Sequence, residues 1–173
     1  MKWVTRQHVH IDRTASAWLI RTHIDPAAEF AFVPAGTDPA ALDGHTFDMR
    51  GAEFGHAGQR CTFEALLDRY QLAGDPTLAE MGATIREADV PPVRTRRPEA
   101  AGLAALLTGF LDTVPDDAER LQATAPLYDA LHAYCRRKVA ARATGQSQAA
   151  AKATSRPRLS YGRRIAAHLD HDD

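Results

Sequence analysis

Residues 2–33 read KWVTRQHVHIDRTASAWLIRTHIDPAAEFAFV, and this stretch decides the fold class. Apolar and polar side chains alternate over residues 2–11, which predicts a β-strand. Asp12 is a residue type favoured at helix N-caps, and helical spacing of apolar residues follows until Asp25-Pro26 ends the helix. Residues 29–33 form a second predicted strand, closed by Pro34. Since strand–helix–strand units are right-handed, we expect the two strands to be parallel.

The rest of the body is predicted to be mainly helical. A third short strand is expected over residues 46–50, and glycines make residues 51–60 an irregular loop. Signals for helix starts follow at Thr62, Asp75-Pro76, Pro98-Glu99 and Asp116. Residues 140–155 are predicted to be a linker or a poorly packed helix, and residues 161–169 one more short helix. The predicted fold class is α+β, with a small N-terminal βαβ-type sheet packed against four to five mainly C-terminal helices.

Charge divides the chain into a body and a tail. Residues 1–135 carry a net charge of −7, whereas residues 136–173 carry +6. We therefore predict a domain over residues 1–138 and a basic, Ala/Arg-rich tail over 139–173. Basic tails bind nucleic acid in many proteins. Here, however, Tyr161 is the only aromatic residue among the basic residues of the tail, so side chains that could stack on bases are nearly absent. Nucleic acid is therefore not the favoured partner.

Composition also limits the cellular setting. Of the residues, 45% are hydrophobic and 25% charged, which is ordinary for a globular protein. No apolar run is long enough for a membrane span, so no membrane partner is expected. The N-terminus lacks the apolar core of a signal peptide, and two cysteines cannot form a disulfide framework. We expect a cytoplasmic protein.

His10, Glu53 and His56 are the predicted metal ligands. Two imidazoles and one carboxylate are the set that typically holds Fe(II) and is usable by Mn, while Zn is a further candidate. Asp12 follows His10 at the predicted junction of strand and helix, where its carboxylate would orient a ligand from behind. The competing interpretation is ordinary: His10, Glu53 and His56 are solvated polar residues, and Asp12 caps its own helix.

Two arginines offer an oxyanion site. Arg13 lies in the first turn of the first predicted helix, where free backbone N–H groups favour anions, and Arg60 precedes another helix. Arg13 is equally suited to an ion pair with a carboxylate of the body. Cys61, just before Thr62, is predicted to be a small buried apolar residue rather than a reactive thiol.

Several separated blocks carry a resemblance to a known family. They are residues 10–21 (HIDRTASAWLIR), 24–26 (IDP), 47–48 (FD), 53–56 (EFGH), 61–64 (CTFE), 98–100 (PEA), 102–103 (GL) and 128–131 (YDAL). In this order they resemble the C-terminal domain of the chromate resistance protein ChrB family, here in a stand-alone form. Many relatives have Cys-Pro where this chain has Ser16-Ala17, and some have a histidine near Arg86.

The resemblance implies a protein linked to chromate and related oxidative or metal stress. It strengthens a shared polar pocket of His10, Asp12, Glu53 and His56, to which Asp89 and Glu99 are weaker additions. We expect a transition metal, Fe or Mn before Zn, that acts on a small oxyanion or a reactive oxygen species. The alternative is a non-catalytic sensor of metal or chromate that acts through the basic tail.

Overall fold

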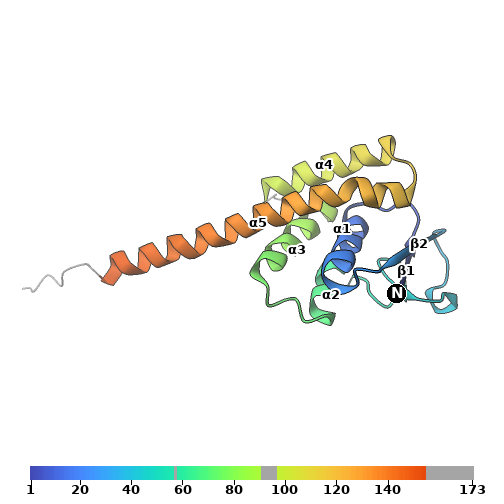
Figure 1. Cartoon of the computed structure of the whole chain (residues 1–173), viewed down its shortest axis with the longest axis horizontal. Coiled ribbons are helices and arrows are strands. Elements are labelled where there is room, and N and C mark those ends of the chain that lie inside the picture. Colours follow the sequence, from blue (N-terminus) through green and yellow to red (C-terminus); the bar gives the residue numbers. More distant parts are fainter. Residues whose placement is uncertain (57, 91–96, 155–173) are drawn as a thin grey trace, which may run out of the picture. The chain divides into compact units, whose positions relative to one another are not determined.

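The computed structural model describes residues 1–56, 58–90 and 97–154, with side chains up to residue 145. The chain divides into two units, Met1–Ala140 and Ala141–Asp173. The first unit contains a small sheet and the helices that cover it, which establishes the predicted α+β class (Figure 1). In the second unit, residues 141–154 are helical. The short helix predicted over residues 161–169 lies outside the described residues.

Three parallel strands form the sheet in the order β2-β1-β3. They are β1 (Lys2–Arg6), β2 (Glu29–Val33) and β3 (His45–Thr46). The pairing of β1 with β2 runs from Lys2 opposite Glu29 to Arg6 opposite Val33, which confirms the predicted βαβ unit. β1 is the central strand, and its interior residues Trp3 to Thr5 are buried because neighbours cover both faces.

The first strand is shorter than its alternating pattern predicts. β1 ends at Arg6, and helix α1 (Ile11–Leu19) already begins at Ile11, so residues 8–10 do not continue the strand. His8 has a left-handed φ of 61°, which turns the backbone away from the extended form. The strand predicted from the alternation over residues 2–11 therefore ends at Arg6, and the prediction is wrong for the residues that follow.

A carboxylate from far along the chain holds this turn in place. Asp117 accepts hydrogen bonds from the backbone N–H groups of His8, at 2.9 Å, and Val9, at 2.8 Å. The buried Arg120 guanidinium donates to Asp117 at 2.7 Å and to the Val9 carbonyl at 3.2 Å. We call these two residues, Asp117 and Arg120 at the start of helix α5 (Asp117–Thr154), the α5 clamp. It satisfies backbone groups that would otherwise need a strand partner.

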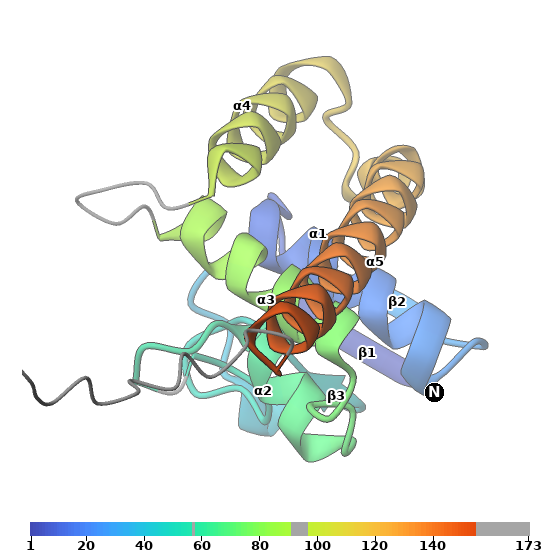
Figure 2. The same cartoon turned by 90° about the vertical axis from the view of Figure 1, so that its left-hand side faces the viewer.

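Helix α1 is the centre of the body. All nine of its residues are buried, and it contacts α2 (Thr62–Arg69), α3 (Pro76–Asp89) and α4 (Pro98–Thr113). Figure 1 shows it between the strands and α3, and Figure 2 shows the same helices and strands turned by 90°. A π-helical turn, η1 (Ile20–Ile24), follows α1 and ends at Asp25, as the Asp25-Pro26 signal predicts. A short 3-10 turn, η2 (Pro39–Ala41), precedes β3.

The last helix, α5 (Asp117–Thr154), continues through Pro126 rather than restarting there. The part of α5 that belongs to the first unit reaches the core, where Tyr128 and Cys135 are fully buried. Asp116 accepts a hydrogen bond from the Glu119 backbone N–H at 2.9 Å, as its predicted role at a helix start requires. Among the described residues, no helix combines the length and apolar character needed to cross a membrane.

Candidate functional site

Asp12 lies in the first turn of α1, but its carboxylate caps a different helix. It accepts hydrogen bonds from the backbone N–H groups of Thr62, at 2.6 Å, and Phe63, at 3.0 Å, which are the first residues of α2. The side chain is 1% exposed. The sequence predicts that Asp12 caps its own helix; instead His10 occupies that N-cap, without a side-chain capping bond. Asp12 therefore joins two helices through a buried charge.

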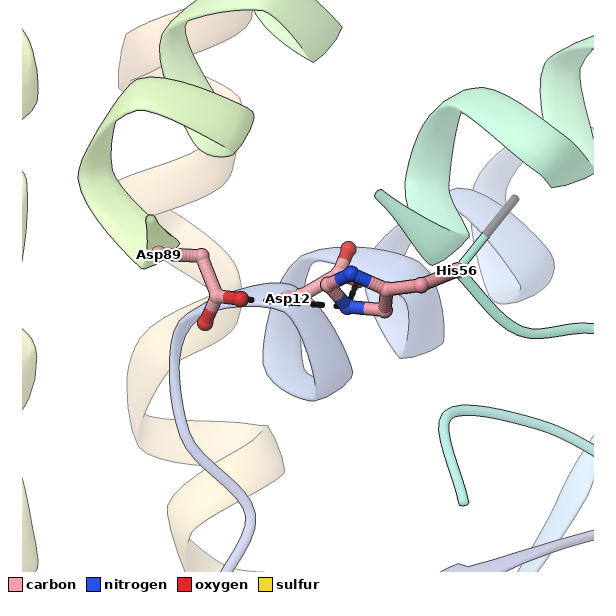
Figure 3. A group of neighbouring side chains, drawn as sticks. All are labelled: Asp12, His56 and Asp89. Carbon is pink, nitrogen blue, oxygen red and sulfur yellow. Dashed lines mark ion pairs between the residues drawn. The ribbon is translucent and has the colours of Figure 1, made fainter. Parts of the chain in front are cut away.

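His56 projects from the loop before α2 towards this carboxylate (Figure 3). Its Nε2 atom lies 3.2 Å from Asp12 Oδ2, 3.4 Å from Asp48 Oδ1 and 3.9 Å from Asp89 Oδ2. The hydrogen bond to Asp12 is the main reason that the pKa of His56 rises to about 9, while partial burial opposes the shift. In the absence of a metal, the imidazole is therefore positively charged at neutral pH.

Asp89, the last residue of α3, completes a group of three possible metal ligands. One ligand atom from each of Asp12, His56 and Asp89 lies within 4.8 Å of the others. Figure 3 shows that the three side chains come from three segments and point towards one another. One imidazole nitrogen and two carboxylate oxygens form a donor set that suits Mn, Fe or Zn. The set fits a divalent transition metal.

Asp48 borders the same group. Burial, followed by the charge of Asp12, raises the pKa of Asp48, and the same two causes in the same order raise that of Asp89. Asp48 has a left-handed φ of 46°, and it accepts a hydrogen bond from the Thr62 hydroxyl at 2.9 Å. The sequence interpretation missed Asp48 as a site residue. The available signal was its place in the Phe47-Asp48 block of the family resemblance.

The structure leaves two of the three predicted ligands outside this group. The Glu53 carboxylate lies 2.8 Å from His45 Nδ1, on a partly exposed surface. The His10 Nε2 atom is buried and has no hydrogen-bond partner among the described residues. Burial lowers the pKa of His10, and the charge of Asp89 only partly offsets that effect. Of the predicted ligands, His56 alone belongs to the group.

The other predicted residues are in ion pairs. Glu99 binds Lys138 of α5. Arg13 is buried, with Nε 3.2 Å from Asp48 Oδ2, and burial lowers its pKa. Arg60 forms a two-nitrogen pair with the Asp68 carboxylate. The two arginines thus face different carboxylates and do not converge on one oxyanion position.

Cys61 is buried and serves as the N-cap of α2. Its backbone N–H donates to Glu64 at 3.2 Å, and Glu64 in turn binds Arg86 at 3.0 Å. Burial and the nearby Asp12 charge raise the pKa of the thiol far above its ordinary range. The thiol is therefore protonated at neutral pH, and its burial agrees with its predicted role as a small buried residue.

An open cleft of about 1100 Å³ reaches the group from one side. Its walls are the loops around residues 35–39 and 48–56, together with Arg6 at the end of β1. His56 and Asp48 both line it, as do Arg50 and Glu53. A small polar ligand in this cleft therefore reaches the imidazole without any movement of the buried carboxylates.

Comparisons with known proteins agree on one family. The model of the ChrB C-terminal domain matches residues 3–135. Protein ChrB of Cupriavidus metallidurans is 38% identical over 133 residues, which are 77% of this chain and 40% of that protein. The chain thus spans less than half the length of this curated relative, and no solved structure matches it. On the family match and the sequence identity together, the chain belongs to the ChrB C-terminal domain family.

Proposed function

We propose that this chain is a metal-binding module of a chromate-resistance response, and that Asp12, His56 and Asp89 hold the ion. The observation that carries the proposal is the meeting of three ligand atoms within 4.8 Å from segments far apart in sequence. The membership in the ChrB C-terminal domain family supports the link to chromate resistance.

The local charge balance supports a bound cation. Asp12, Asp48 and Asp89 bring three carboxylates together, and burial and mutual repulsion raise the pKa values of Asp48 and Asp89. Arg13 and a protonated His56 offset part of this charge. A divalent ion would take over that role, because it binds the carboxylates directly and displaces the imidazole proton.

The two carboxylates favour Mn over Zn for this donor set, and Fe is the other candidate because it binds mixed sets of imidazole and carboxylate ligands. Three protein ligands leave coordination positions open, and the cleft beside His56 gives a small molecule access to them. This arrangement favours chemistry on a reactive oxygen species or a small oxyanion over a closed, purely sensory site. The metal would supply the redox change, while Asp12 would hold its place through its hydrogen bonds to α2.

Metal content of matched variants tests the proposal. The parent chain, after incubation with Fe(II), Mn(II) or Zn(II) and removal of excess ion, is expected to retain one ion at this group. His56→Gln and Asp89→Asn should each lose it, and Glu53→Gln is the control because its carboxylate lies outside the group. Asp12 is left unchanged because it caps α2. A parent that takes up none of the three metals, or equal loss in Glu53→Gln, would overturn the proposal.

A further inference from the structure

A pair of histidines, His23 and His132, lies outside the group around Asp12. His23 belongs to η1 and His132 to α5, and their ring centroids are 6.0 Å apart with planes inclined at 57°. Both rings also contact the Trp18 indole, at centroid distances of 5.5 Å for His23 and 5.7 Å for His132. Two imidazoles from residues 109 positions apart in the sequence therefore lie next to each other and contact the same indole ring.

The π-helical turn is what places His23 there. The Asp25 backbone N–H donates to the Ile20 carbonyl at 2.7 Å, which is the five-residue spacing of a π-helix. In a regular α-helix, the residue five positions after Trp18 would point about 140° away around the axis. The wider π turn brings His23 back to the side of the helix that carries Trp18. Such turns are rare and occur frequently at functional sites.

The surroundings of the pair favour a bound cation. Asp129, three residues before His132 on the same helix, accepts a hydrogen bond from the Trp18 indole N–H at 2.8 Å. Asp75, the N-cap of α3, also acts on His23 with its negative charge. The nearby Arg21 guanidinium stacks over Phe30, 5.1 Å from the ring centroid. Burial, and then the neighbouring His132, lower the pKa of His23, so its imidazole is neutral and able to coordinate at neutral pH.

We propose that His23 and His132 together form a second metal site, for a divalent ion that prefers imidazole ligands, such as Zn²⁺ or Cu²⁺. Metal–nitrogen bonds of about 2.0–2.1 Å place two imidazole centroids about 5–6 Å apart, and the observed centroid separation of 6.0 Å is at the upper end of this spacing. Water completes the coordination. The ion ties η1, at the end of α1, to the middle of α5. By the usual order of affinities, Cu²⁺ binds more tightly than Zn²⁺.

Zinc binding by the full chain tests this site independently of the Asp12 group. The number of Zn²⁺ ions bound per chain is measured by equilibrium dialysis at neutral pH for the parent, His23→Gln, His132→Gln and the double variant. Each single variant is expected to lose one ion, and the double variant to lose no more than that, because both ligands serve one site. His56→Gln should retain this ion, which separates the result from the proposed function.

His8→Asn is the matched control, since His8 is exposed and its left-handed backbone suits asparagine. Copper adds a direct signature: sub-stoichiometric Cu²⁺ should show electron paramagnetic resonance splitting from two nitrogens, reduced in either His23→Gln or His132→Gln. If His132→Gln fails to fold, His23→Gln decides alone, because His23 is more exposed than His132. Unchanged Zn²⁺ stoichiometry in His23→Gln, or the same loss in His8→Asn, would overturn the site.

Discussion

Two histidine–carboxylate pairs lie near the cleft. Their contact distances are similar, but the two pairs differ in burial and in hydrogen bonding. His56 Nε2 is 3.2 Å from Asp12, and His45 Nδ1 is 2.8 Å from Glu53. The Asp12 side chain is 1% exposed and bound to two backbone N–H groups, whereas Glu53 is 44% exposed. A short contact alone does not make a functional site. Burial and supporting hydrogen bonds distinguish a pair that can take part in binding or catalysis from an ordinary surface ion pair.

Removal of the buried carboxylate should have the largest effect. Asp12→Ala leaves the Thr62 and Phe63 N–H groups buried without partners and removes the acceptor of His56. We expect the free energy of unfolding to fall by about 3–5 kcal/mol, measured by urea denaturation. Asp12→Asn keeps one acceptor oxygen and should lose less. A loss below about 1 kcal/mol for Asp12→Ala would mean that α2 does not depend on this cap.

The contribution of His56 to the free energy of unfolding should depend on pH, because its imidazole is protonated in the metal-free fold. Its pKa in the metal-free fold is about 9, above the ordinary 6.5, so protonation favours the folded state. This contribution is fully present below pH 6.5 and is lost as pH rises through about 9. Because 43% of the side chain is exposed, solvent screening keeps the effect at about 1 kcal/mol or less.

The measurement is the unfolding free energy of the parent minus that of His56→Gln between pH 6 and 10, which should shrink across this window. NMR titration of the imidazole gives the pKa directly. The raised pKa values of Asp48 and Asp89 act in the same direction, since their ionisation disfavours the folded state, but from a window that begins near pH 4. A His56 pKa at or below 6.5 would contradict the prediction.

The exposed pair should give the smallest effect. Glu53→Gln removes one charge from an ion pair in which both side chains are partly exposed, so the expected loss of unfolding free energy is below about 1 kcal/mol. Raising the salt concentration should reduce even this difference, as charge screening requires. A loss comparable to that of Asp12→Ala would remove the contrast between the two pairs.

Local signals account for most of the fold that sequence alone predicts. Alternation followed by Pro34 defines β2 at Glu29–Val33, and Asp75 before Pro76 predicts the start of α3, where Asp75 does accept bonds from Thr77 and Leu78. The end of β1 could not be predicted in the same way. Its alternating pattern continues to Ile11, but the α5 clamp binds residues 8 and 9 from more than a hundred positions away.

The candidate site shows the same limit. Residue type predicts His56 as a ligand. It does not single out Asp89 in the same way, because nothing in the sequence indicates that the end of α3 meets the start of α1. Glu53 is three residues before His56, but the two side chains bind different partners, His45 and Asp12 respectively. The Glu53 backbone N–H donates to the Thr46 hydroxyl at 2.9 Å, which places its carboxylate beside His45 instead.

The α5 clamp also has a consequence for the order in which the chain can mature on the ribosome. Asp12 and His56 emerge early, yet the backbone that leads into α1 is fastened by Asp117 and Arg120, which follow more than a hundred residues after His8. Chains synthesised from the N-terminus cannot close this long loop until that helix has left the exit tunnel. Nascent chains that stall before residue 117 would therefore carry the ligand residues without the fastening that positions them.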